Sequence, residues 1–356
     1  MFGVLWRLTR PALFALDAET AHHAAIWALS LFDGAPGMAA TVRRSIRADR
    51  EVLSTQIGAL RFPNCVGLAA GLDKNAQAVT GLFGLGFGAV EIGTVTPRAQ
   101  PGNPQPRLFR VPTEHALINR MGFNNDGAAA VAARLRELKF RPAPVGANLG
   151  KNKDTPIEQA TEDYVIAAQR LAPVADYLVV NLSSPNTPGL RTLQEPQALE
   201  RLLTAVRRAA GPELPLWLKI APDLADEAVD AAVDIAIGCG FDALIATNTT
   251  LQRPFFHPLS GEAGGLSGAP LRQRSTEVVR RAFLRARGRL PIVGVGGIFS
   301  GADAWEKIRA GACFVQLYTG FIYGGPMMVK QVLDDLEVLA AKAGIARLAD
   351  AVGLDA

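Results

Sequence analysis

Cysteine, histidine and long apolar runs are all scarce in this sequence. Its 356 residues include three cysteines and four histidines, and Cys65, Cys239 and Cys313 lie far apart without C-x-x-C spacing. We therefore expect no metal site and no disulfide framework, and a reducing, cytoplasmic compartment is favoured. The longest apolar run near the N-terminus, residues 24–32, has about half the ~20 residues that a spanning helix needs. No cleavable signal pattern accompanies it, so we expect any membrane contact to be peripheral.

Neither sign of charge dominates the chain. It has 37 basic and 33 acidic residues, giving a net charge of +4, and these residues are interspersed along the sequence. Such a mild excess suits an anionic substrate, a phosphate-bearing cofactor or a lipid surface. A nucleic-acid partner is not expected, because the sequence has no aromatic-basic motif.

Short β-branched runs alternate with amphipathic helical patterns along most of the chain. Continuously apolar strands imply burial on both faces, and eight strand-helix units predict an α/β fold closed as a TIM (β/α)8 barrel. An open doubly wound sheet is the alternative, but no G-x-G-x-x-G follows the first strand. The predicted strands are residues 66–71, 89–95, 145–150, 177–183, 216–221, 243–249, 292–298 and 314–320, and the helices between them include 126–138, 198–209, 225–239 and 301–310.

Residues 1–45 stand outside this alternation. Apolar Phe2, Leu5, Trp6 and Leu13, with Arg7 and Arg10 on other faces, suggest one amphipathic helix, and residues 21–32 suggest a second. Such helices suit a lid, a dimer contact or a membrane anchor. Periodicity alone favours packing against the rest of the protein.

Polar residues recur where the predicted strands end, and a barrel brings those ends to one face. The glycine-rich turns at residues 294–303 and 316–326 follow the last two strands, where barrels commonly bind phosphate.

Lys219 ends an apolar strand and suits a Schiff base, a carboxylate contact or stabilisation of a flavin anion. A simple ion pair with Asp223 is the structural alternative.

The segment NLSSPNTPGLR, residues 181–191, follows the fourth predicted strand. Its prolines stiffen the loop, and its asparagines offer amide donors and acceptors to a planar ligand. A serine-hydrolase triad has little support, because no G-x-S-x-G and no neighbouring histidine occur there.

Eight motifs, taken in their order along the chain, are specific enough to indicate a family. Together they resemble the dihydroorotate dehydrogenases, with similarity over about residues 50–335. The motifs are AAGLDKN (69–75), EIGTVTPRAQPGNPQPRLFR (91–110), NRMGFNN (119–125), NLGKNKDTP (148–156), NLSSPNTPGLR (181–191), IATNTT (245–250), GGLSG (264–268) and GVGGI (294–298).

The resemblance implies FMN-dependent oxidation of (S)-dihydroorotate to orotate in de novo pyrimidine (UMP) biosynthesis, with Ser184 as the catalytic base. The implied FMN contacts are Ala70, Gly71, Leu72, Asp73, Lys74, Thr94, Asn148, Asn181, Lys219, Thr247, Gly268, Gly297, Tyr318 and Thr319. The implied substrate contacts are Lys74, Asn119, Arg120, Met121, Gly122, Phe123, Asn181, Asn186, Asn248 and Thr249.

The subtype depends on the base loop and the N-terminus. Cytosolic relatives carry cysteine as the base, whereas the membrane-associated, quinone-reducing class carries serine and an N-terminal helical extension. Ser184 and residues 1–45 therefore resemble the quinone-dependent class, with His22, Arg110 and Tyr318 on the quinone side; the neighbouring His23 leaves the register open. The expected arrangement is a membrane-associating, quinone-access segment at residues 1–45 and an FMN-binding barrel at residues 46–356, bound peripherally to the cytoplasmic face of the inner membrane.

Two other functions are less well supported by the sequence. A soluble relative that reduces fumarate is disfavoured by Ser184 and by the N-terminal extension. A noncatalytic barrel that binds a phosphorylated metabolite would not need Lys74, Ser184 and Lys219 together around a flavin.

Overall fold

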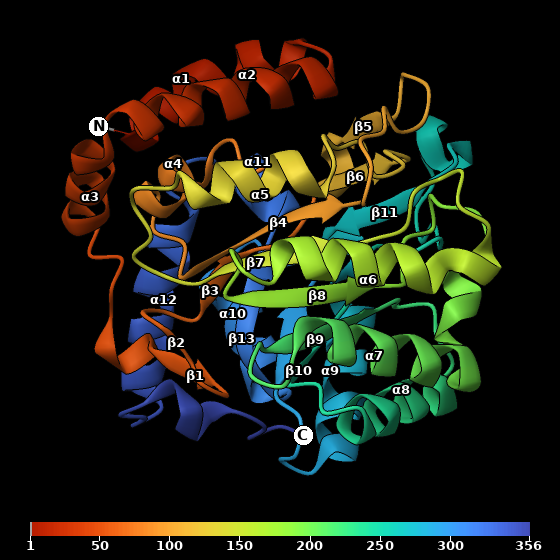
Figure 1. Ribbon diagram of the computed structural model, residues 1–356. Helices are drawn as coiled ribbons and strands as arrows, with labels where there is room; N and C mark the ends of the chain where they lie inside the picture. Colours follow the sequence, from red (N-terminus) through yellow and green to blue (C-terminus); the bar gives the residue numbers. More distant parts are fainter. Residues whose placement is uncertain (1) are drawn as a thin grey trace.

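The computed structural model describes residues 2–356 (Figure 1). The predictions for the side chains of Phe2, Leu5 and Arg7 lie outside the described residues. In addition to the α-helices and strands given below, the chain has short 3-10 helices at Leu31–Gly34, Glu51–Leu53, Pro112–Glu114, Ile157–Gln159, Leu190–Gln194 (η5), Pro258–Gly261, Ala269–Leu271 and Leu348–Ala351.

Eight parallel strands form a closed barrel, which confirms the predicted fold class. Each strand pairs with its neighbours in parallel, and the last strand pairs with the first through Val315↔Val66 and Leu317↔Leu68. The strands are fully or almost fully buried because helices cover the ring from outside. They are β3 (Val66–Leu68), β4 (Ala89–Val95), β7 (Val145–Leu149), β8 (Tyr177–Asn181), β9 (Leu216–Ile220), β10 (Ala243–Ala246), β12 (Ile292–Val295) and β13 (Ala312–Leu317).

The outer helices follow from apolar residues at helical spacing. In α7, Leu199, Leu202, Leu203 and Val206 form one buried stripe, with a proline in the first turn and Gly211 at positive φ after the end. The barrel helices are α4 (Val79–Gly84), α5 (Ala128–Arg136), α6 (Ala160–Leu171), α7 (Pro196–Ala210), α8 (Asp226–Gly238), α9 (Arg272–Ala286), α10 (Gly301–Arg309), α11 (Thr319–Gly324) and α12 (Met328–Lys342).

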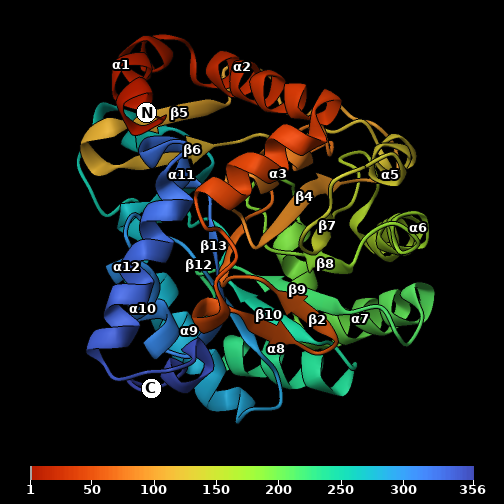
Figure 2. The ribbon, with the colours of Figure 1, turned by 90° about the vertical axis from the view of Figure 1, so that its left-hand side faces the viewer.

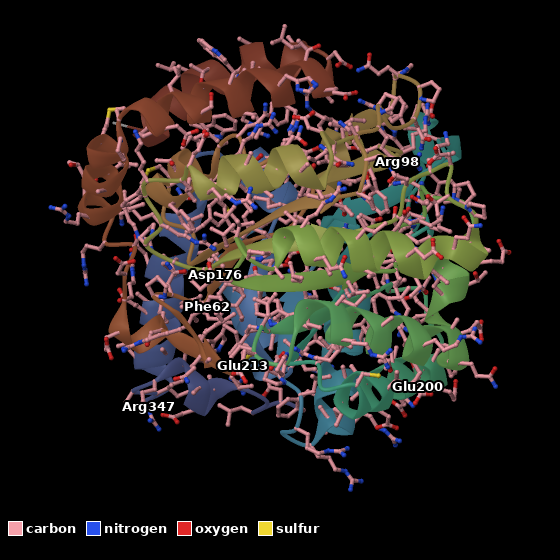
Figure 3. The ribbon with its side chains drawn as sticks, in the orientation of Figure 1. Phe62, Arg98, Asp176, Glu200, Glu213 and Arg347 are labelled. Carbon is pink, nitrogen blue, oxygen red and sulfur yellow. The ribbon has the colours of Figure 1, made fainter. Side chains whose placement is uncertain are left out.

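Aromatic side chains fill the end of the barrel where the strands begin. Tyr177 stacks on Trp217 at 3.9 Å between ring centroids, and Phe62 lies 4.7 Å from Phe314. Phe62 comes from the hairpin of β1 (Thr55–Ile57) and β2 (Leu60–Phe62), which closes this end. Figure 3 shows Phe62 at this end and Arg98, which follows β4, at the opposite end.

A second, antiparallel sheet stands at the other end of the barrel, and strand-helix alternation did not predict it. It consists of β5 (Leu108–Val111), β6 (Ala116–Asn119) and β11 (Gly265–Gly268), with β6 in the centre. The strands enclose a small apolar cluster of Val111, Ala116, Ile118 and Leu266. This sheet holds the polar loops that follow β6 above the barrel mouth.

The described part of the N-terminal segment, residues 2–45, forms three α-helices, so the prediction of two helices was incomplete. They are α1 (Phe2–Ala15), α2 (Ala18–Ser30) and α3 (Pro36–Ser45). Helix α3 was missed because its sequence has few large apolar residues. Helix α2 packs on α4 and β5, and α3 packs on α4; Figure 2 shows α1 and α2 lying over β5 and β6.

Asp17 begins α2 as its N-cap and accepts hydrogen bonds from the backbone N–H groups of Glu19 and Thr20. Among residues 2–356, no single helix is long and apolar enough to cross a bilayer. The segments Ala18–Gly34 and Pro36–Ser45, bent by 106° at their junction, reach that length and composition only when taken together.

We predict that Gly146→Ala destabilises the barrel. A Cβ at this position would lie 2.1 Å from the ring of Tyr177, which is held against Trp217. The expected loss is about 1–3 kcal/mol of unfolding free energy, the usual cost of overpacking a core. Gly238→Ala is the control, because nothing lies within 4 Å of its added Cβ. Denaturant unfolding of both variants checks this; equal stability would contradict the proposed close packing.

Candidate active site

A cavity opens to solvent where the barrel strands end. Every strand of the ring except β7 contributes residues to the cavity wall, either from the end of the strand or from the loop that follows it. The predicted site residues that line it are Ala70, Gly71, Lys74, Thr94, Asn119, Met121, Gly122, Phe123, Asn181, Ser184, Asn186, Lys219, Thr247, Asn248, Thr249, Gly268, Gly297, Tyr318 and Thr319.

A buried carboxylate that the sequence motifs did not single out lies beneath the floor of the cavity. Glu91 on β4 is fully buried and accepts hydrogen bonds from Asn148 Nδ2 at 2.7 Å and Gln316 Nε2 at 2.6 Å. Gln316 lines the cavity, and its buried Oε1 has no hydrogen-bond partner within the described chain. A buried acceptor of this kind is costly unless a ligand donates to it.

A network of neutral amides and hydroxyls rises from this floor. Asn181 Nδ2 donates to Thr94 Oγ1 and to Asn148 Oδ1, both at 3.1 Å. Asn181 Oδ1 accepts from Ser183 Oγ at 2.9 Å and from Asn248 Nδ2 at 3.2 Å. The network therefore fixes the amide orientations on three strand ends before any ligand binds.

Two lysines present their ammonium groups to this cavity. Lys219 is 5% exposed, and burial lowers its pKa, an effect that the Glu91 carboxylate opposes. Burial also lowers the pKa of Lys74 to about 8, while the nearby Glu19 carboxylate acts in the opposite direction. The two lysines carry more positive charge than the single buried carboxylate of Glu91 offsets. The cavity therefore favours anionic ligands.

Ser184 is 6% exposed and lies in the cavity wall between the barrel and the second sheet. Its Oγ accepts a hydrogen bond from the backbone N–H of Asn186 at 3.3 Å. Asn186 Nδ2 in turn donates to Asn119 Oδ1 at 3.1 Å, which joins the loop after β8 to the end of β6. The serine hydroxyl is thus held in a water-poor wall, facing the same space as both lysines.

Glycines shape the side of the cavity formed after β12 and β13. Gly297 has φ of 72°, and a Cβ there would lie 2.4 Å from Arg272 Cβ. Behind this loop, Lys307 is fully buried and donates to Ser275 Oγ at 2.6 Å, which itself donates to the carbonyl of Gly296 at 3.2 Å. Opposite, Ser267 Oγ lies 2.8 Å from Thr319 Oγ1. These contacts hold the glycine-rich loops in place beside the cavity, in the kind of position where barrels bind phosphate.

Comparison with known proteins identifies the family. A sequence profile described as dihydroorotate dehydrogenase matches residues 52–339. The chain is 55% identical to the dihydroorotate dehydrogenase (quinone) of Myxococcus xanthus, over 99% of this chain and 98% of the relative. The chain belongs to this family. The enzyme of Acidithiobacillus ferrooxidans, also described as dihydroorotate dehydrogenase (quinone), is 51% identical over 97% of this chain and 98% of its own length.

Solved structures agree with the sequence comparison. The structure of DHODH from Eimeria tenella in complex with ferulenol superposes with a TM-score of 0.85 and 40% identity, covering 95% of this chain and 96% of that one. These findings confirm the predicted resemblance to the quinone-dependent class of dihydroorotate dehydrogenases. Membership of the family implies a flavin cofactor and an oxidoreductase activity.

Four of the predicted FMN and substrate contacts lie outside the cavity wall. Leu72 is buried beside it, and Asp73 accepts hydrogen bonds from the backbone N–H groups of Gln77 and Ala78, holding the chain that leads into α4. Asn148 supports the amide network from below. Arg120 turns away and forms an ion pair with Glu262 at 2.5 Å. The family motifs thus include residues that hold the backbone in place as well as residues that face the cavity.

On the predicted quinone side, His22 points inward and His23 outward. Burial, followed by the charge of Lys74, lowers the pKa of His22 to about 2, so His22 is neutral, whereas the side chain of His23 is 64% exposed. Tyr318 lines the cavity and donates to the Gly71 carbonyl at 3.4 Å. Arg110 donates to the carbonyls of Phe14 and Leu16 at 3.0 and 2.9 Å, and so caps the end of α1.

A buried ion pair fastens α2 beside the cavity. Arg107 and Glu19 are 9% and 5% exposed at their side chains and lie 2.7 Å apart. Arg107 also donates to the carbonyl of Asn103 at 2.8 Å, and Asn103 Nδ2 donates to the Arg120 carbonyl at 2.9 Å. Within residues 2–356, no cluster of histidine, cysteine or acidic residues has a geometry able to hold a metal ion.

Proposed function

We propose that this chain is an FMN-dependent enzyme that oxidises dihydroorotate to orotate and passes the electrons to a membrane quinone. The observation that carries the proposal is the convergence of Ser184, Lys74 and Lys219 on one cavity. The two lysines suit anionic groups, and Ser184 supplies a proton acceptor in the same cavity. The full-length similarity to quinone-dependent relatives supports the choice of electron acceptor.

The floor and the glycine-rich side of the cavity fit FMN. The unpartnered Gln316 Oε1 and the Lys219 ammonium suit the polar edge of a flavin ring, and the loops at Gly268, Gly297 and Thr319 suit its phosphate. FMN, when bound, supplies the two-electron acceptor for the substrate. Lys219 stabilises negative charge at that edge, because its ammonium lies in a buried setting where charge interactions are strong.

The opposite side of the cavity fits a flat ring that bears a carboxylate. Lys74 supplies positive charge, while Asn119, Asn186 and Asn248 supply amide donors and acceptors. Ser184 accepts the proton from one ring carbon as hydride leaves its neighbour. A serine hydroxyl is a weak base near neutral pH, so exclusion of water and fixed positioning are essential to its action.

Residues 1–45 are proposed as the quinone-access and membrane-associating segment, with residues 46–356 as the catalytic barrel. Among the described side chains of this segment, five are apolar, large and exposed: Leu8 at 73%, Trp27 at 66%, Leu31 at 56%, Met38 at 50% and Leu16 at 45%. An apolar surface on amphipathic helices favours a position at the bilayer interface. We propose His22, Arg110 and Tyr318 as the polar residues on the quinone side; Tyr318 lines the cavity, and Arg110 binds the carbonyls at the end of α1. We propose a peripheral position on the cytoplasmic face of the inner membrane.

The first test separates the two half-reactions. Anaerobic dihydroorotate should bleach the flavin of detergent-solubilised protein, and a ubiquinone analogue should restore its colour much faster than fumarate does. Ser184→Ala should slow bleaching by about 10²- to 10⁴-fold while leaving reoxidation unchanged, since it removes only the base. Bleaching followed by preference for fumarate would contradict the quinone assignment. An unbleached flavin in loaded wild-type protein would reject the substrate, and normal bleaching of Ser184→Ala would reject the base.

Orotate binding should weaken as pH rises through about 8, because Lys74 then loses the charge that holds the carboxylate. The pKa of Lys74 in the folded protein lies below the usual value for lysine. Below about pH 8 the side chain is charged, and the dissociation constant of orotate should not change with pH. Well above it, the constant should rise by about tenfold per pH unit. Titration with orotate at each pH, followed by flavin absorbance, measures this dissociation constant. Lys74→Met should bind weakly at every pH; wild-type affinity that stays constant to pH 9.5 would contradict this role.

Trp27→Ser should weaken binding to vesicles that contain anionic phospholipid by about tenfold, because it removes a large exposed apolar side chain. Leu354→Ser is the matched control: Leu354 is 55% exposed but lies near the C-terminus, far from α2 in Figure 1. Co-sedimentation measures both variants. Equal loss in the two, or no loss in Trp27→Ser, would contradict the assignment of the membrane surface to residues 1–45.

A further inference from the structure

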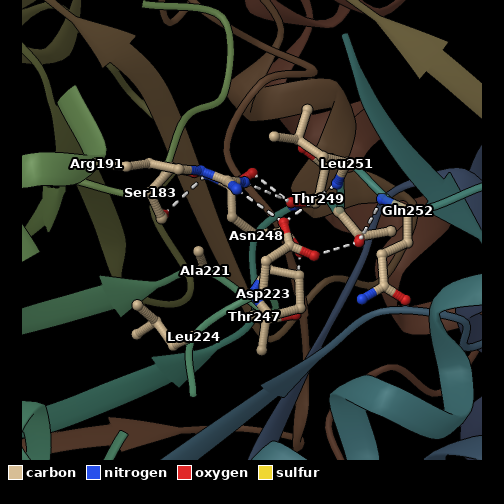
Figure 4. Close-up of polar contacts among 12 residues, drawn as sticks. Ser183, Arg191, Ala221, Asp223, Leu224, Thr247, Asn248, Thr249, Leu251 and Gln252 are labelled. Carbon is tan, nitrogen blue, oxygen red and sulfur yellow. Dashed lines mark hydrogen bonds and ion pairs between the residues drawn. The ribbon is translucent and has the colours of Figure 1, made fainter. Parts of the chain in front are cut away.

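An arginine at the end of the base loop connects three barrel loops. Arg191, in η5, donates from Nη1 to Asp223 Oδ2 at 2.7 Å, from Nε to the Ser183 carbonyl at 3.1 Å and from Nη2 to the Thr249 carbonyl at 3.1 Å. These acceptors follow β9, β8 and β10 respectively. Figure 4 shows the three contacts spreading from one guanidinium.

Asp223 holds this guanidinium in place. The side chains of Arg191 and Asp223 are 23% and 19% exposed, so their charge interaction is largely shielded from water. The Asp223 carboxylate also accepts from Thr250 Oγ1 and, at 3.1 Å, from the Leu251 N–H. It therefore fixes the chain just after Thr249 while it orients Arg191.

The two carbonyls held by Arg191 belong to the active site. The Ser183 carbonyl is part of the peptide bond that leads directly into Ser184, and the Thr249 carbonyl belongs to another residue of the cavity wall. Ser183 is further held by Asn248 Nδ2, which donates to its Oγ at 2.9 Å. One rigid fork thus sets the spacing between the base and the substrate-binding residues.

We infer that Arg191 and Asp223 form a positioning pair that aligns Ser184 with the substrate, an inference that rests on the proposed function of Ser184. Neither residue lines the cavity, so the pair acts through the Ser183–Ser184 peptide and the Thr249 carbonyl. A planar guanidinium can reach a carboxylate and two carbonyls at once, whereas a lysine ammonium is a single point donor. A lysine at position 191 would therefore keep the positive charge but could not hold all three acceptors.

The decisive variant is Arg191→Lys, which keeps the charge and removes the fork. Its flavin reduction by dihydroorotate should slow by about 10²-fold, the scale expected for a misplaced reacting group. FMN content and quinone reoxidation should stay at wild-type levels, because Arg191 touches neither the floor nor the N-terminal helices. Asp223→Asn should slow reduction in the same direction and provides a second, milder variant.

Arg207→Lys is the matched control. Arg207 pairs with Asp242 at 2.9 Å, is 19% exposed and donates to the Leu214 and Gly240 carbonyls, but lies where the strands begin. Flavin reduction in this variant should match the wild type. If it slows as much as in Arg191→Lys, general loosening of the barrel explains both effects and the inference fails.

A double-mutant cycle separates positioning from general stability. In the Ser184→Ala background, Arg191→Lys should slow flavin reduction by less than about threefold, because the group that it aligns is gone. An equal effect in both backgrounds would overturn the inference, as would normal reduction in Arg191→Lys or parallel loss of FMN. Wild-type protein that dihydroorotate fails to bleach would instead reject the proposed function, so the two failures are distinguishable.

Discussion

Closure of the barrel through β13 and β3 is the constraint on which the rest of the structure depends. The chain's last barrel strand pairs with its first, and the N–H of Ala69 donates to the Leu317 carbonyl at 3.0 Å at the upper end of this seam. Closure removes both sheet edges and forces all eight carboxyl ends to converge. Lys74 and Tyr318 follow the first and the last barrel strand, and they share one cavity because the ring is closed.

Convergence of strand ends also creates an electrostatic problem. A buried carboxylate and a buried ammonium are each unfavourable unless hydrogen bonds or opposite charges compensate them. Glu91 meets this requirement with two amide donors and with the nearby charge of Lys219. Gln316 retains an unused acceptor, so the floor is complete only on its protein side. This incompleteness is the structural sign of a ligand site.

Much of this architecture was predictable from the sequence, because apolar runs and helical spacing report burial directly. All eight barrel strands and α7 were found in this way. The sheet of β5, β6 and β11 was not, since each strand has only four residues and β11 lies far along the chain from the hairpin of β5 and β6. Glu91 and Arg191 were missed for another reason. Their importance comes from partners on other strands and loops, and no local pattern encodes a contact such as Arg191 to Asp223.

The motifs that identified the family were informative about the site as a region and less so about single residues. Asp73 and Arg120 lie within motif strings next to cavity residues, yet Asp73 holds the turn before α4 and Arg120 pairs with Glu262. A compact site needs its backbone held as firmly as its reacting groups, because a strand end has few hydrogen bonds of its own.

The same requirement explains how the N-terminal helices are joined to the barrel. Glu19 brings a charge from α2 into a buried position, which is stable only because Arg107 neutralises it. Arg107 also binds the Asn103 carbonyl, and the Asn103 side chain holds the carbonyl of Arg120 in the substrate loop. An apolar contact would let α2 slide, whereas this chain of directional bonds fixes it relative to that loop. The helices that face the proposed membrane and the loop that faces the proposed substrate therefore share one support.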